Sequence, residues 1–158
     1  MRSEFVEELS QLMNEDEDIF VLLGDLGFGI FDNLREAYPH RCINVGSAEQ
    51  LMLGMACGMT LQGKRVICYS ITSFLIYRPF EFLRNYLNHE EIPVKLVGSG
   101  RNTDYVEAGF THHSTEAKSL LSQLENIRLY FPESVNDMRK IVKEFVYLDS
   151  PAFLSLKR

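Results

Sequence analysis

The sequence lacks the features of several broad protein classes. It has no run of about 18 apolar residues, and no apolar leader of the secretory type opens it, so neither a membrane-spanning helix nor a secreted protein is expected. Low-complexity runs are absent, and 46% of the residues are hydrophobic, which excludes a disordered or fibrous chain. We therefore expect one compact domain that spans residues 1–158.

Positive charge and paired cysteines are scarce as well. The net charge is -6, and the acidic run at 15–18 would repel phosphate backbones, so nucleic acid is not an expected partner. The three cysteines, Cys42, Cys57 and Cys68, form no Cys-x-x-C pair, and two of them lie in apolar runs where reduced, buried thiols are usual. This use of cysteine favours a cytoplasmic protein.

Short apolar runs recur along the chain in the manner of buried strands. They do not alternate with polar residues, which is typical of strands covered on both faces of a parallel sheet, and helical periodicity separates most of them. The expected fold is α/β: a single doubly wound domain with a mostly parallel sheet of about six strands and helices on both faces. The expected strands are 19–23, 42–45, 65–71, 94–97, 127–130 and 152–156, and helical segments include 4–13, 80–88 and 135–146.

One helix has a recognisable start, and one segment has no period at all. Ser47 is a candidate N-cap with Gln50 three residues later in a capping-box pattern, which predicts a helix that runs to about Leu61 and is closed by Gly63. Residues 98–114 are polar, contain glycine and follow no period. A loop of that length in a compact domain is usually functional.

The carboxyl ends of parallel strands are where doubly wound folds bind ligands, and three polar features gather there. Asp25 lies in the glycine-rich turn 24–29, which follows a strand but has neither the dinucleotide nor the P-loop spacing. Glu49 lies in the first turn of an apolar helix, and the pair His112 and His113 lies in the long loop. Adjacent histidines seldom bind one metal ion, so no metal site is predicted within the chain.

Two interpretations of Glu49 are open from its position alone. A carboxylate in the first turn of a helix usually lies on the surface, where it offsets the helix dipole. The apolar residues on nearly every side of this helix instead indicate a buried carboxyl group that is kept for function. No serine or cysteine stands beside a histidine in a nucleophile turn, which disfavours a self-sufficient hydrolase.

Three stretches resemble one enzyme family. Residues 44–59, which read Asn-Val-Gly-Ser-Ala-Glu-Gln-Leu-Met-Leu-Gly-Met-Ala-Cys-Gly-Met, resemble the signature of the pyrimidine-binding domain of transketolase-type thiamine-diphosphate enzymes. Residues 69–85 are similar to the segment that lines the aminopyrimidine in transketolases and in the beta subunits of 2-oxo acid dehydrogenases. Residues 109–113 resemble the family's Gly-x-Thr-His loop, and the likeness continues in order to residues 151–158.

This resemblance implies roles for individual residues. Glu49 would hydrogen-bond the N1′ nitrogen of the aminopyrimidine and thereby activate the cofactor, and His112 would face the substrate near the reactive carbon. Phe74 or Tyr77 would stack on the pyrimidine ring. The other residues that the resemblance places around the cofactor are Asp25, Ser47, Arg78 and His113.

The sequence also departs from the family pattern. It has no Gly-Asp-Gly motif with a downstream asparagine, the pattern that binds the diphosphate and a divalent metal, and it ends where the usual C-terminal domain would begin. The expected arrangement is a split enzyme, in which a partner subunit with that motif holds the diphosphate and Mg²⁺. The apolar helix after Glu49 implies a large interface, and a homodimer within a heterotetramer is expected.

The resemblance implies a reaction, with alternatives. The first is two-carbon ketol transfer from a ketose, as in a split transketolase. However, Ala108 stands where transketolases carry an aspartate that recognises the donor sugar, so the donor stays open. The second is a beta-type component of a 2-oxo acid decarboxylase or dehydrogenase, which acts on a keto acid. The third is a non-catalytic pyrimidine-domain module that binds a partner or self-associates.

Overall fold

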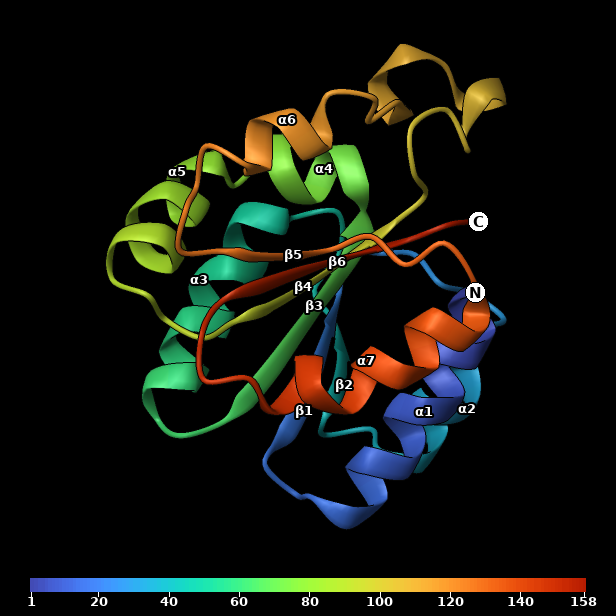
Figure 1. The fold of residues 1–158 in the computed structure, drawn as a ribbon. Helices are drawn as coiled ribbons and strands as arrows, with labels where there is room; N and C mark the ends of the chain where they lie inside the picture. Colours follow the sequence, from blue (N-terminus) through green and yellow to red (C-terminus); the bar gives the residue numbers. More distant parts are fainter.

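A six-stranded parallel sheet forms the centre of the computed structural model, which describes residues 1–158 (Figure 1). The strand order is β2-β1-β3-β4-β6-β5, and each pair of neighbours is parallel. The prediction of about six mostly parallel strands in one α/β domain is confirmed. The strands are β1 (Ile19–Leu23), β2 (Cys42–Asn44), β3 (Arg65–Ile71), β4 (Lys95–Ser99), β5 (Arg128–Tyr130) and β6 (Ala152–Leu156).

Helices cover both faces of the sheet, as predicted (Figure 1). On one face, α1 (Arg2–Glu15), α2 (Asp32–Ala37) and α7 (Val135–Tyr147) enclose a core of 21 buried residues, including Phe5 and Phe145. On the other face, α3 (Glu49–Leu61), α4 (Thr72–Tyr77), α5 (Phe80–Phe82) and α6 (Ala117–Leu121) enclose a core of 19. The two cores explain the unbroken apolar runs, since β4 and β6 are buried at every residue. None of these helices is long and apolar enough to cross a membrane.

The helix predicted at 80–88 is wrong in kind. After the single turn of α5, the chain continues as a π-helix, η1 (Leu83–His89), in which Leu83 and Leu87 are both fully buried. The side chain of Asn88 accepts a hydrogen bond from the backbone amide of Asn126, and the Asn126 side chain donates to the Asn88 carbonyl oxygen. These contacts join segments 38 residues apart, and a local period does not contain them.

Ser47 does not cap α3, which corrects the predicted helix start. The helix begins at Glu49, its N-cap residue is Ala48, and no side chain caps it. Instead, the turn before the helix is shaped by the side chain of Asn44, which accepts a hydrogen bond from the Gly46 amide at 3.0 Å. Gly46 has a φ of 76°, a left-handed conformation that glycine adopts without strain.

Two other predicted boundaries have different outcomes. The helix end is confirmed, because α3 ends at Leu61 and Gly63 follows with a φ of 85°. The segment 98–114 is not wholly irregular: β4 continues to Ser99, and two 3-10 helices follow, η2 (Val106–Ala108) and η3 (Phe110–His112). Each of these helices is only one short turn, which has no period to detect.

Candidate functional site

Glu49 lies at the point where the sheet changes its winding direction. The chain passes from β1 to β2 on one side of β1 and returns to β3 on the other, so the crevice beyond β1 and β3 is the switch point at which such folds bind ligands. The Glu49 side chain is 0% exposed there. A Cβ added to Gly24, directly after β1, would lie only 3.2 Å from Oε1 of Glu49. The carboxylate is therefore buried at the site edge, and the surface interpretation of Glu49 is wrong.

Both oxygens of the Glu49 carboxylate have a hydrogen-bond partner. The hydroxyl of Ser70, on β3, donates to Oε1 at 2.6 Å, and Nη1 of Arg78 donates to Oε2 at 2.6 Å. A buried carboxylate needs such partners because its desolvation is otherwise costly. The sequence prediction included Arg78 but missed Ser70, whose signal is a lone hydroxyl in the apolar strand 66–71.

An aromatic and cationic cluster lies beside this carboxylate. The guanidinium carbon of Arg78 lies 3.9 Å from the ring centroid of Phe74, and the Phe74 and His112 rings meet edge to face at 4.8 Å between centroids. Phe74 and Arg78 are four residues apart at the end of α4, a spacing that brings side chains onto one helix face. The structure thus joins Glu49, Arg78, Phe74 and His112 into one cluster.

Tyr77 lies on another side of α4. Its side chain is 42% exposed, and burial together with the neighbouring Glu116 carboxylate raises the pKa of Tyr77. The hydrogen bond from Tyr77 in turn lowers the pKa of Glu116. Of the two aromatic candidates, Phe74 is therefore the one that contacts the partners of Glu49.

The histidine loop is fastened to α4 at one point. The hydroxyl of Ser73 donates to the carbonyl oxygen of Thr111 at 2.8 Å, and this bond holds the turn that carries His112. Nδ1 of His112 lies 3.1 Å from the Thr111 hydroxyl. The neighbouring His113 has a buried Nε2 without a hydrogen-bond partner and packs edge to face on Phe110. The loop therefore presents its two histidines to different surroundings.

Asp25 and Ser47 lie at the rim of the site. Asp25 is exposed with a φ of 55°, a left-handed conformation that aspartate tolerates, and its carboxylate accepts a hydrogen bond from the Asn44 side chain at 3.0 Å. Ser47 is exposed in the turn before α3. Neither contacts Glu49 through a hydrogen bond, and their assignment to the cofactor stays a prediction.

No arrangement for a metal ion appears in the chain: no three His, Cys, Asp or Glu side chains are grouped to hold one. The three cysteines are free and buried. Burial raises the pKa of Cys42 and of Cys57 to about 11, so both are neutral thiols near pH 7.

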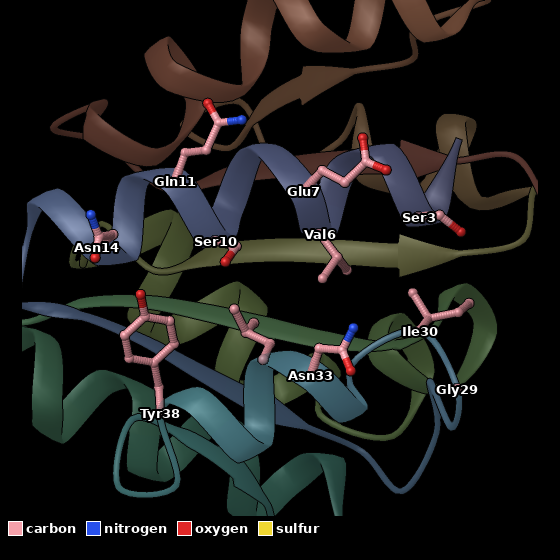
Figure 2. Close-up of a pocket in the computed structure, with 11 residues that line it drawn as sticks. Ser3, Val6, Glu7, Ser10, Gln11, Asn14, Gly29, Ile30, Asn33 and Tyr38 are labelled. Atoms are coloured by element: carbon pink, nitrogen blue, oxygen red, sulfur yellow. The ribbon is translucent and has the colours of Figure 1, made fainter.

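The largest cavity lies away from Glu49. It has a volume of about 670 Å³ and separates α1 from the turn and helix at 29–38, with Val6 facing Ile30 across it (Figure 2). Neutral polar side chains such as Ser10 and Asn33 also line it. None of the predicted site residues does. The buried charge, and not the cavity volume, marks the chemically distinctive place in this fold.

Comparison with known proteins finds relatives along the whole chain. The family model described as "Transketolase, pyrimidine binding domain" matches residues 1–158. One of the two subunits of an apulose-4-phosphate transketolase from Actinobacillus succinogenes is 31% identical over 119 residues, which are 75% of this chain and 38% of that protein. A putative transketolase C-terminal section from Methanocaldococcus jannaschii is 27% identical over 159 residues, 100% of this chain and 50% of the relative. The chain thus spans about half the length of the curated relatives it matches.

Solved structures share the fold. A structure described as a split gene transketolase, inactive beta4 tetramer, has a TM-score of 0.87 at 27% identity and matches 99% of this chain and 50% of its own. The transketolase of Campylobacter jejuni also has a TM-score of 0.87, at 19% identity, over 99% of this chain and 25% of its own. At that identity the second likeness shows the fold alone.

Proposed function

Because the chain belongs to the family of transketolase pyrimidine-binding domains, we propose that it is the cofactor-activating part of a split, thiamine-diphosphate-dependent transketolase-like enzyme. The observation that carries this proposal is the fully buried Glu49 carboxylate at the switch point between β1 and β3. A buried carboxylate at that edge is costly to maintain, and its place coincides with the ligand crevice of the fold.

The crevice around Glu49 fits the aminopyrimidine end of the cofactor. It offers a carboxylate oxygen for a ring nitrogen and, beside it, the aromatic ring of Phe74. Gly24 leaves room at the end of β1, where a Cβ would lie 2.8 Å from the Ser70 hydroxyl oxygen. When it is bound, thiamine diphosphate supplies the carbon nucleophile that attacks a carbonyl group.

Each residue of the cluster then has a task. Glu49 holds a shared proton against N1′ of the pyrimidine, and Ser70 fixes the other carboxylate oxygen so that the group keeps its direction. Phe74 stacks on the ring. His112, in the turn held by the bond between Ser73 and Thr111, faces the substrate. Asp25, Ser47, Tyr77, Arg78 and His113 complete the proposed cofactor surroundings.

A partner subunit holds the other end of the cofactor in this proposal. The residues of this chain suit only the pyrimidine, so we assign the diphosphate and its Mg²⁺ to a subunit with a Gly-Asp-Gly motif. Apolar side chains support a covered surface here: Phe28, Leu51 and Phe110 are 67%, 58% and 82% exposed. Each lies on a segment that also carries a proposed site residue, and we propose a homodimer within a heterotetramer in the cytoplasm.

The proposed reaction is two-carbon ketol transfer from a ketose donor. Two relatives named as transketolase subunits support this choice, one for apulose-4-phosphate and one for 6-deoxy-6-sulfo-D-fructose. The competing reaction is cleavage of a 2-oxo acid. Turnover of a panel of ketose phosphates and keto acids by the same purified complex separates the two.

The test of the proposed function begins with purification of the tagged chain from its native cells together with any bound subunit. In that complex, Glu49→Gln should reduce turnover by about 10²–10⁴-fold, the usual contribution of a positioned proton donor or acceptor. Glu36→Gln, an exposed carboxylate on α2, is the control and should leave turnover unchanged. Near-normal turnover of Glu49→Gln removes the catalytic role, and no thiamine diphosphate binding in any mixture favours a non-catalytic module.

A further inference from the structure

Arg78 occupies the two contacts that an aminopyrimidine would use. Its Nη1 donates to Oε2 of Glu49 at 2.6 Å, and its guanidinium carbon lies 3.9 Å from the centroid of the Phe74 ring. A pyrimidine bound in the same corner needs a carboxylate oxygen for its ring nitrogen and an aromatic face for its ring. Arg78 and the pyrimidine therefore compete for one place.

Burial decides which partner of the ion pair is free to leave. The Glu49 side chain is 0% exposed and is held on its other oxygen by Ser70, whereas the Arg78 side chain is 41% exposed. Arg78 is also the C-cap residue of α4, so its side chain begins at the end of a short helix. The guanidinium is able to turn into water, and the carboxylate is not.

The exchange does not balance unless a proton is added. While it pairs with the guanidinium, Glu49 is an ionised carboxylate and only accepts hydrogen bonds. N1′ of a neutral aminopyrimidine is also an acceptor, and two acceptors cannot form a hydrogen bond with each other. Departure of Arg78 also leaves a buried negative charge, which neutralises by taking up a proton. One proton from solvent meets both requirements, and Arg78 keeps its own charge.

Other ionisable groups near α3 do not pair with Glu49. β1 carries none, and Asp25 beyond it is bonded to Asn44. The ionisable side chains on the other elements that pack against α3 are Arg65, Cys68 and Tyr69 on β3 and Glu81 on α5. The hydrogen bonds of the Glu49 carboxylate come only from Ser70 and Arg78.

We propose that Arg78 is a placeholder for the aminopyrimidine, so that cofactor binding displaces Arg78 from Glu49 and adds one proton to Glu49. The proposal rests on the proposed function of the site. It makes Arg78 a positioning residue that keeps the carboxylate paired and ionised until the cofactor arrives. Cofactor affinity should then fall as the pH rises, because binding takes up a proton.

Calorimetry counts that proton directly. Thiamine diphosphate with Mg²⁺ is titrated into the purified complex in two buffers of equal pH and different ionisation enthalpy. Wild type should take up about one proton more per site than Arg78→Met, in which Glu49 has no cation and is already protonated. Arg78→Lys keeps a cation and should restore the wild-type count. Arg84→Met, on the exposed part of η1, is the matched control and should behave as wild type.

Each other result has a defined meaning. Equal proton uptake by wild type and Arg78→Met overturns the placeholder role, even if the affinity changes. Affinity that falls tenfold or more in Arg78→Met without a change in proton count shows instead that Arg78 contacts the bound cofactor. Absence of any binding heat overturns the proposed function and this inference together.

A second measurement needs neither cofactor nor partner. In the infrared spectrum of the isolated chain, Arg78→Met should show the carbonyl band of a buried protonated carboxylic acid, and wild type should lack it. The band should disappear in the double variant Arg78→Met with Glu49→Gln. A spectrum of Arg78→Met identical to wild type contradicts the proposed protonation of Glu49.

Discussion

The hydroxyl of Ser70 donates to Oε1 of Glu49 over 2.6 Å, which ties the last part of β3 to the first residue of α3. Ser70→Ala removes the only donor to that buried oxygen, and hydrogen bonds to charged groups contribute about 1.5–3 kcal/mol. We expect the free energy of unfolding to fall by that amount in a urea titration. Ser119→Ala, at an exposed position on α6, should change it by less than about 0.5 kcal/mol.

Gly24 and Gly58 should respond in opposite ways to a methyl group. In Gly24→Ala the new Cβ would lie 2.8 Å from the Ser70 hydroxyl oxygen and 3.2 Å from Oε1 of Glu49, and such crowding costs about 1–3 kcal/mol. Gly58 lies inside α3 with no atom within 4 Å of an added Cβ, so Gly58→Ala should stabilise by about 0.5–1 kcal/mol. Thermal unfolding of both variants measures the contrast, and destabilisation by Gly58→Ala would contradict it.

Phe74 and Tyr77 differ in their distance from the carboxylate cluster, and cofactor binding should distinguish them. Phe74 packs against Arg78 and His112, whereas Tyr77 neighbours Glu116. Phe74→Leu should weaken thiamine diphosphate binding by roughly three- to tenfold, the range of an aromatic stacking contact, and Tyr77→Leu should weaken it less. Equilibrium titration of the purified complex gives both constants. A larger loss in Tyr77→Leu would assign the stacking to Tyr77.

The buried Lys95 predicts a pH dependence of stability. Burial lowers the pKa of Lys95 to about 8 from its ordinary value of 10.5, although its ammonium donates to the carbonyl oxygens of Pro93 and Ser150. Between these values the unfolded chain binds the extra proton, so the Lys95 contribution to stability rises with pH from about 8 to about 10.5. The difference in unfolding free energy between wild type and Lys95→Met should move in favour of wild type by roughly 3 kcal/mol over this range.

The subtraction in that experiment removes the effect of other groups. Burial raises the pKa of Cys42 and of Cys57 to about 11, and those thiols lower stability as the pH rises above their unfolded value. Both proteins in the comparison carry the same cysteines. A difference that stays constant with pH would show that Lys95 is charged throughout.

The sequence predicts the sheet well because burial on both faces leaves a local record. Continuous apolar runs such as β6, buried at every residue, show in the chain itself. α4 leaves no such record, since its start is held from afar by the Thr72 hydroxyl, which donates to the carbonyl oxygen of Gly100 at 2.5 Å. Contacts of this kind are set by the fold and not by a period along the chain.

The site divides in the same way. Glu49 is predictable because a charged residue opens an otherwise apolar helix, and the family resemblance gives it a role. Ser70 and Ser73 are not, because each acts through one hydrogen bond to a segment at least 21 residues away. Arg78 is predicted as a neighbour of the cofactor, but only the structure shows that it bonds to the carboxylate itself.

The exposed leucines of α3 have a consequence for the effect of temperature. Leu51 and Leu61 are 58% and 69% exposed in the single chain, so an assembly that covers them gains from apolar burial. That gain weakens on cooling and carries a large negative heat-capacity change. Subunits joined through this helix should therefore separate in the cold and reassociate on warming, and chilled storage would release them as inactive single chains.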